Sequence, residues 1–449
     1  MKKIYSIFYF ILISIFLFGE SDTIKLTIKI LPINSYYNKQ ASQIYNSFDL
    51  FLSPSMTQSL DIASSTYNFI FYLLDKNKWN IIQNPKYKHL AQTIAFYTGI
   101  IGLTYFPFGD SWLHEEFHRS ILTYHKIRSY NQVYNFPIFS ELISVNNVRD
   151  SDLIRFKAES PYDFVRLHEA GIEGEYLLIN RLNQFSFFYN QPYPYFISNI
   201  LSTLNTISYV WLCHTEKAEE ITNELNQNEK TILERDFTGL DFTAWVYDLF
   251  RPYESYVQRG VHPSGIGINR YIKPSNLNNE EINYLKTQGY MQILNIISPF
   301  TIGINKINIG SLKYNFAFRY YLSSFGTDIA FYNYFKVNKL NLIIAPHFYK
   351  NYNKLFTGFE LEVFDLTFFS NKVLLNSNFQ LFSQPKDLYF FANTKFLGYS
   401  IKANLNVEIY KNLYLQLGLI NKSRGWVAGI VFQDKIFSFY SGISLRFYQ

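Results

Sequence analysis

The chain has 449 residues, of which 48% are apolar and 17% charged. This length and apolar content supply core material for about two or three domains, which excludes an intrinsically disordered chain. The single cysteine, Cys213, excludes an intramolecular disulfide and any zinc site built on two or more cysteines. The net charge of +6 is spread thinly, without Lys/Arg clusters, so nucleic acid is not an expected partner.

Residues 1–21 predict an export signal at the start of the chain. Lys2 and Lys3 form a basic start, residues 4–18 are apolar, and small residues within 19–21 suit a cleavage site. We therefore expect the mature protein outside the cytoplasm, in the envelope of a bacterium with two membranes. An uncleaved membrane anchor is the alternative interpretation of the same segment.

Residues 22–285 predict a mainly helical domain, and two apolar segments within it have two interpretations. Residues 94–108 and 195–213 carry no charged side chain. We expect both to be buried core helices. The alternative is a pair of membrane-spanning helices, as in an inner-membrane zinc peptidase followed by a soluble β domain.

A metal-binding motif lies in the first half of the chain. Asp110 or Ser111 can cap a helix over about residues 112–127, and this helix contains His-Glu-Glu-Phe-His at 114–118. Histidines four residues apart project from the same face of a helix, one turn from each other, so both imidazoles can hold one zinc ion. A pair of structural histidines on a solvated helix is the alternative.

This HExxH sequence resembles the motif of zincin metallopeptidases, and in particular of the gluzincin type. The resemblance implies that His114 and His118 are zinc ligands and that Glu115 is the general base and proton shuttle. It also implies a third ligand from a glutamate on a later helix. Only the five residues of the motif carry the resemblance firmly.

Residues 166–178 predict the helix that supplies the third ligand, because zinc in catalytic sites takes three protein groups and leaves a fourth position open. We predict Glu173 as this ligand, with Glu169 and Glu175 as rivals. Surface carboxylates without a metal are the alternative interpretation of all three.

Small residues in the same helix indicate a close helix contact. Ala170 and Gly174 are four apart, which lets this helix approach the one that carries His114. Glycine in a helix interior lowers stability, so its presence calls for a packing reason. His168 is a candidate supporting residue or hydrogen-bond donor to the transition state, with an ordinary exposed histidine as the alternative.

Residues 236–271 concentrate Gly, Pro, His, Arg and Tyr, and they include the segment Asp-Phe-Thr-Ala-Trp at 241–245. This composition is typical of a shaped loop. We predict either a lid or substrate wall for the site, or a linker packed against the mouth of a barrel.

Residues 286–449 predict an antiparallel transmembrane β-barrel. Apolar and polar residues alternate strictly over 401–409, and similar alternation recurs over 314–320, 413–419 and 437–447. Short turn signals separate these runs, and we expect about 10 to 12 strands of membrane-spanning length. An aromatic content of 19% suits the aromatic girdles of such a barrel. A soluble β-sandwich is the alternative.

Together these features predict an α+β multidomain protein with a mainly helical domain followed by a C-terminal β-barrel. The expected function is that of an outer-membrane-anchored zinc peptidase, with the lipid bilayer and a peptide or protein substrate as partners. The alternatives are a non-catalytic outer-membrane protein with a helical plug or scaffold, and the inner-membrane peptidase described above.

Overall fold

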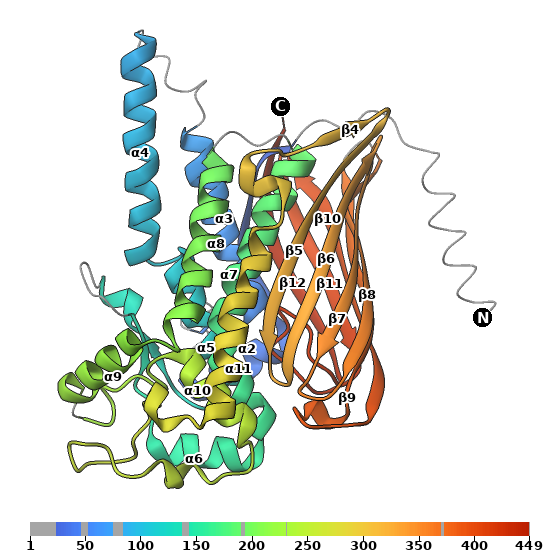
Figure 1. Cartoon of the computed structure of the whole chain (residues 1–449). Helices are drawn as coiled ribbons and strands as arrows, with labels where there is room; N and C mark the ends of the chain where they lie inside the picture. The colour runs from blue at the N-terminus through green and yellow to red at the C-terminus, as the bar shows by residue number, and fades with distance from the viewer. Residues whose placement is uncertain are drawn as a thin grey trace.

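The computed structural model describes residues 24–45, 53–74, 84–136, 143–189, 194–229, 231–369 and 372–448. The expected export signal at 1–21 lies outside these residues. The described chain has a helical part and, beside it, a tall curved antiparallel sheet (Figure 1). The expectation of a helical region followed by an antiparallel C-terminal sheet is therefore confirmed.

The helical part is built around one long central helix, α7, which runs roughly parallel to the long axis of the sheet (Figure 1). A two-stranded sheet of β2 (Tyr130–Asn131) and β3 (Val145–Asn146) and several short 3-10 turns connect the helices. The helices are α2 (Ser35–Tyr45), α3 (Met56–Leu74), α4 (Pro85–Tyr105), α5 (Asp110–Tyr124), α6 (Asp150–Glu159), α7 (Pro161–Tyr189), α8 (Pro194–Leu212), α9 (Glu216–Asn228), α10 (Asp241–Phe250) and α11 (Asn279–Met291).

The large sheet has ten strands in the described part of the chain, in the order β1-β12-β11-β10-β9-β8-β7-β6-β5-β4. Nine of them follow each other along the chain, as expected for a meander. The tenth, β1, comes from the N-terminal region and pairs antiparallel with the last strand. The strands are β1 (Ile24–Asn34), β4 (Ile307–Ile309), β5 (Leu312–Ser323), β6 (Gly326–Val337), β7 (Leu340–Lys350), β8 (Leu355–Phe368), β9 (Val373–Pro385), β10 (Lys395–Tyr410), β11 (Leu413–Lys422) and β12 (Ile436–Tyr448).

The sheet is curved but is not a closed barrel within the described residues, because β1 and β4 are its two edges and do not pair with each other. Helices lie between these edges instead. Helix α3 packs along β1, α7 packs on β5 next to the other edge, and the two helices contact each other. The sheet and the two helices thus enclose the interior together.

The sheet is apolar outside and polar inside. Leu417 is 48% exposed and Ile409 is 55% exposed on the outer face, whereas the inward Asn406 and Gln416 are 0% and 2% exposed. This alternation follows the period of two that the sequence shows. A soluble sandwich shows the opposite arrangement, with its apolar face covered by a second sheet.

The two apolar segments of the helical region form most of α4 and α8. In the part of the chain that the structure describes, none of the helices has the combination of length and apolar character that crossing a bilayer requires.

Helix α7 has two faces with different partners. Because successive residues of a helix are about 100° apart, Leu167, Gly171 and Glu175 share one face, and Arg166, Glu169 and Glu173 share the opposite one. The first face contacts α5, and the second contacts the loop between β11 and β12. This division decides which acidic residues reach the candidate site.

Candidate metal centre

The two histidines of the HExxH sequence lie on one side of α5, as predicted. Their ring centroids are 4.9 Å apart. His118 is fully buried, and its Nδ1 lies 2.6 Å from the carbonyl oxygen of Leu167 on α7. Because a carbonyl only accepts, Nδ1 carries the proton and Nε2 keeps its lone pair free for a metal.

Asp241, the first residue of α10, supplies the carboxylate that converges on both histidines. Its Oδ2 lies 3.1 Å from His114 Nε2 and 3.5 Å from His118 Nε2. His114, His118 and Asp241 each offer one ligand atom, and these three atoms lie within 4.8 Å of one another. Asp241 is held at the start of α10, where the backbone N–H of this residue donates to the hydroxyl of Tyr209 at 3.1 Å.

Two of the three distances between these ligand atoms match those around a bound metal ion such as zinc. Nitrogen and carboxylate ligands about 2.0–2.2 Å from a tetrahedral zinc lie roughly 3.3 Å from each other. The two histidine-to-carboxylate distances, 3.1 and 3.5 Å, bracket that value. Two imidazoles and one carboxylate are also the donor set of many catalytic zinc sites. These three residues could therefore hold a metal ion.

Glu175 supports the site from α7. Its Oε1 lies 2.7 Å from His114 Nδ1, so the carboxylate accepts the proton of that nitrogen and leaves Nε2 directed toward Asp241. A carboxylate behind a metal-binding imidazole fixes its orientation and raises its basicity. Glu175, named as a rival third ligand, is thus placed on the far side of the imidazole from the group.

Glu173, the predicted third ligand, has other partners in the structure. Its Oε1 accepts hydrogen bonds from Arg166 at 2.9 Å and from the backbone N–H of Gly429 at 2.7 Å. The rival Glu169 accepts from the indole of Trp426 at 3.2 Å. Both carboxylates lie on the face of α7 that is turned away from α5, so the geometry favours Asp241 instead of Glu173.

The glycines of α7 allow α5 to lie close to it. A Cβ atom at Gly171 would lie 2.2 Å from His114 Nε2, and one at Gly174 would lie 2.9 Å from the ring of Phe117. Both distances are shorter than van der Waals contact. The close approach expected from the small residues is therefore present, with Gly171 beside the metal motif.

Acidic side chains surround the two imidazoles. Burial lowers the pKa of His114, but hydrogen bonds to Asp241 and Glu175 and the charge of Glu115 outweigh it and raise the pKa well above its ordinary value. Burial would raise the pKa of Asp241, but the imidazoles of His118 and His114 hold it below its usual range. The surroundings thus attract positive charge, as a cation site requires.

Glu115, the predicted general base, is buried beside this group. Burial raises its pKa to about 8, the charge of His114 opposes that shift, and the charge of Asp241 adds to it. A cation held by the histidines would act in the same direction as His114 and lower this pKa. Near neutral pH the carboxyl group is then able both to take up and to release a proton.

His168 has a structural role beside the site. Its Nε2 lies 2.7 Å from Asp248 on α10, whose carboxylate also pairs with Lys157 and Arg259. The ring of Phe237 packs against both imidazoles, with its centroid 5.0 Å from that of His118 and 6.0 Å from that of His168. His168 therefore fixes the position of α10, and with it Asp241, without itself belonging to the group of His114, His118 and Asp241.

Asp241 lies within 236–271, the segment that we expected to form a lid, a substrate wall or a linker. It is 127 residues from His114, so no local spacing connects the two. The signal that the sequence does offer is an acidic residue at the start of the apolar helix of 241–250. Tyr209, from the second apolar segment, is a further residue of the site that the sequence did not single out.

No protein-family model matches the chain, and neither a curated protein nor a solved structure matches it. The likeness to zincin peptidases rests on the motif at 114–118 and on the residues that surround it.

Proposed function

We propose that the protein is a zinc-dependent peptidase anchored in the outer membrane of a bacterium. The observation that carries this proposal is the convergence of His114, His118 and Asp241 on one point, with their ligand atoms within 4.8 Å of one another, next to a buried Glu115. Glu115 occupies the position of the general base in the HExxH motif.

Each residue of the site has a distinct task in this mechanism. His114, His118 and Asp241 would hold a zinc ion, while Glu175 and the carbonyl of Leu167 orient the two imidazoles. Zinc in such a site supplies Lewis acidity, which polarises the scissile carbonyl and acidifies water. Glu115 takes a proton from the attacking water and passes it to the leaving amine.

The support for membrane anchoring is the inverted polarity of the sheet. Apolar residues such as Leu417 and Ile409 are exposed on the outside, and amides such as Asn406 and Gln416 are buried inside. Outer-membrane barrels have this arrangement because their outer face contacts lipid. Exposing such a surface to water is unfavourable, since each square ångström of apolar area costs about 25 cal/mol.

The proposal is tested by metal analysis and hydrolysis with full-length protein in detergent. We expect about one zinc per chain in the wild type and none in His114→Ala. Glu115→Gln should keep its zinc but lose hydrolysis of a library of quenched fluorescent peptides. Equal hydrolysis by Glu115→Gln and the wild type would contradict the mechanism.

A non-catalytic scaffold is the second candidate, and one observation favours it. Helices α3 and α7 lie between the two edges of the sheet, where they complete its enclosure. A helical part with only this task needs no metal. It would show no stoichiometric zinc and would tolerate His114→Ala without loss of function or fold.

A further inference from the structure

Helix α8 has polar residues on its buried side and large apolar residues on its exposed side. It carries no charged residue over 194–212. Its buried polar side chains include Ser198, Asn199, Thr203 and Thr206. Its large exposed side chains are Leu201, Leu204 and Trp211. The exposed polar residues between them, Asn205 and Ser208, are small and uncharged. This polarity is the reverse of that of a helix on the surface of a water-soluble protein.

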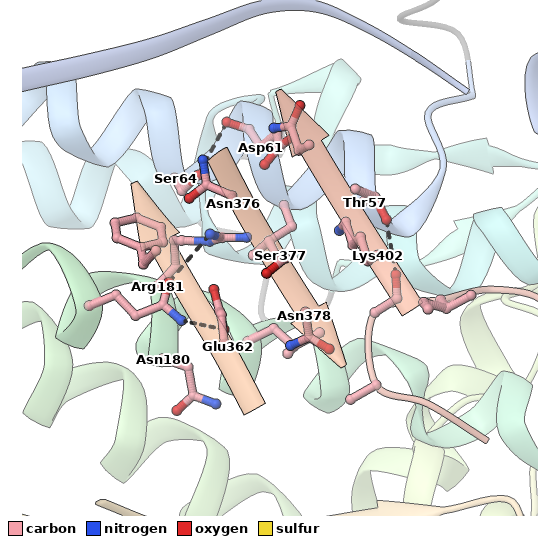
Figure 2. A pocket seen from close by; sticks show the side chains of 18 of the residues that line it. Thr57, Asp61, Ser64, Asn180, Arg181, Glu362, Asn376, Ser377, Asn378 and Lys402 are labelled. Carbon is pink, nitrogen blue, oxygen red and sulfur yellow. Dashed lines mark hydrogen bonds between the residues drawn. The ribbon is translucent and has the colours of Figure 1, made fainter. Parts of the chain in front are cut away.

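Helix α3 shows the same reversal. Its buried polar side chains include Asp61, Ser64, Ser65 and Asn68. Two of them, Asp61 and Ser64, line a polar cavity that lies between this helix, α7 and strands β8, β9 and β10 (Figure 2). The large exposed side chains are Phe69 and Leu73, which lie one helical turn apart on the same side. The polar side of α3 thus faces the protein interior, and an apolar side faces outward.

The connection from α11 to β4 repeats this arrangement without a long helix. Residues 287–305 carry no charge. Its buried polar side chains include Gln292, Asn295, Ser298 and Thr301. Asn295 donates to the hydroxyl of Tyr176 at 3.0 Å and accepts from the backbone N–H of Tyr320 at 2.8 Å. Its large exposed side chains are Tyr290, Ile293, Ile297, Ile302 and Ile304.

These three surfaces together connect the two edges of the large sheet. The 3-10 turns at Gln292–Ile296 and Pro299–Ile302 contact β5 on one side and α8 on the other. Helix α8 contacts α3, and α3 packs along β1. Figure 1 shows α3, α7 and α8 standing beside one another next to the sheet. The exposed apolar side chains therefore continue from the outer face of the sheet across the helices and back to the sheet.

Aromatic residues lie at one end of this apolar surface. Trp211 and Tyr290 are both exposed, and their ring centroids lie 5.4 Å and 6.0 Å from that of His214. Exposed charged residues follow directly beyond them, with Glu216 after α8 and Lys286 before Tyr290. Trp and Tyr are enriched at membrane–water interfaces, where an apolar ring with a polar group meets both phases. This boundary has the composition of such an interface.

From this arrangement we propose that the lipid-facing surface encircles the body formed by the sheet and the helices, so that α3, α8 and residues 290–304 contact acyl chains directly. The inference rests on the proposed membrane anchoring and extends it to the helical part. Only one side of each element meets lipid, because the polar side faces the protein. Lipid fits better than a protein partner, because a partner covers one patch and this surface continues into the outer face of the sheet on both sides.

The proposal places the metal centre beside the bilayer. Tyr209 of α8 accepts a hydrogen bond from the backbone N–H of Asp241 and is two residues from Trp211. The group of His114, His118 and Asp241 therefore lies near the aromatic end of the lipid-facing surface. A substrate would reach it at the level of the membrane surface.

The test is electron paramagnetic resonance on the full-length chain in phosphatidylcholine vesicles. Leu204→Cys on α8 and Ile293→Cys are each labelled with a nitroxide, and the wild type, whose Cys213 is buried, gives the background. Oxygen concentrates in lipid and a nickel chelate stays in water. We expect collisions with oxygen to exceed those with the chelate at both positions. A preference for the chelate at either position would overturn the proposal.

Two reference variants separate this result from the anchoring by the sheet. Leu417→Cys reports the outer face of β11, and Glu224→Cys reports an exposed position of α9 outside the apolar surface. We expect the labels at 204 and 293 to match that at 417, and the label at 224 to prefer the chelate. Oxygen preference at 417 alone would refute lipid contact by the helical part and leave anchoring by the sheet intact. Chelate preference at 417 as well would refute both.

Discussion

The imidazole of His114 occupies the space that a side chain at position 171 would fill. A Cβ atom at Gly171 would lie 2.2 Å from His114 Nε2 and 2.4 Å from Cδ2. The atom proposed to bind the metal therefore packs directly on the backbone of α7. This contact connects the HExxH helix to the central helix of the protein, and it makes the glycine a requirement of the site.

Gly171→Ala should abolish metal binding. The methyl group would push the imidazole of His114 away from Asp241 and Glu175, because the backbone of α7 cannot move without disturbing its contacts with the sheet. Zinc per chain, measured by atomic emission, should fall from about one to near zero. Gly99→Ala is the matched control, since a Cβ at this position of α4 lies 3.6 Å from its nearest neighbour.

That control should keep its zinc and gain slightly in stability, because alanine is better than glycine in a helix by about 1 kcal/mol. Full zinc binding by Gly171→Ala would contradict the packing that we describe.

Asp241→Ala and Glu173→Gln should affect different properties, zinc content in the first and folding stability in the second. We expect the first to lose zinc, because it removes a ligand. The second should keep zinc but lower the free energy of unfolding by about 3–5 kcal/mol, because it leaves the buried Arg166 without its carboxylate. Zinc content and chemical denaturation of both variants test this. Loss of zinc in Glu173→Gln alone would restore Glu173 as the ligand.

Glu175→Gln should weaken zinc binding without eliminating it. The carboxylate orients His114 through Nδ1 at 2.7 Å, and glutamine keeps the shape but loses the charge. Changes in such supporting groups typically lower metal affinity by about 10- to 100-fold. Competition with a zinc chelator measures the affinity. An affinity equal to that of the wild type would show that the contact is incidental.

The metal-free protein should lose stability as the pH rises, through Glu115. Burial raises the pKa of this group to about 8, from an ordinary value of 4.5. The folded state therefore binds the proton more tightly than the unfolded state does. The stability from this group is complete below pH 4.5 and is lost as the pH rises through about 8.

Thermal unfolding of the metal-free wild type and Glu115→Gln at several pH values between about 5 and 8.5 measures this effect. The variant should lose less stability over that range, by on the order of a few kcal/mol, since one pKa unit corresponds to about 1.4 kcal/mol. Zinc should reduce the difference, because its charge lowers the pKa of Glu115. Parallel pH profiles for the two metal-free proteins would exclude a raised pKa.

Leu417→Arg should distinguish a lipid-facing sheet from a water-facing one. Leu417 is 48% exposed on the outer face of β11. If this face contacts lipid, an arginine there should cost about 2–4 kcal/mol near the bilayer midplane. If it contacts water, the change should lie within about 0.5 kcal/mol. Urea titrations of folding into phospholipid vesicles measure the difference.

The control for that experiment is Lys411→Arg, an exposed position in the turn after β10 that keeps its charge. It should leave the folding free energy unchanged. An equally small effect of Leu417→Arg would remove the support for membrane anchoring.

Local patterns in the sequence determined the type of the main elements and the shared helix face of the two histidines. A spacing of four residues on a helix places His114 and His118 on one side of α5 whatever the rest of the fold does. The alternation over 401–409 likewise determines that β10 has one apolar and one polar face. Both results depend only on the period of the helix or the strand, which a short stretch of sequence is enough to show.

Tertiary structure alone decided the third member of the candidate metal site and the enclosure of the sheet. Residues 166–178 offer three glutamates as candidates, and packing placed the helix face with Glu175 against α5 and the face with Glu173 against the loop between β11 and β12. Asp241 joined the histidines from a distant helix. Strand β1 pairs with the last strand, β12, and helices lie between the two edges of the sheet. Such pairings depend on which surfaces meet when the chain packs, and short-range periodicity carries no information about that choice.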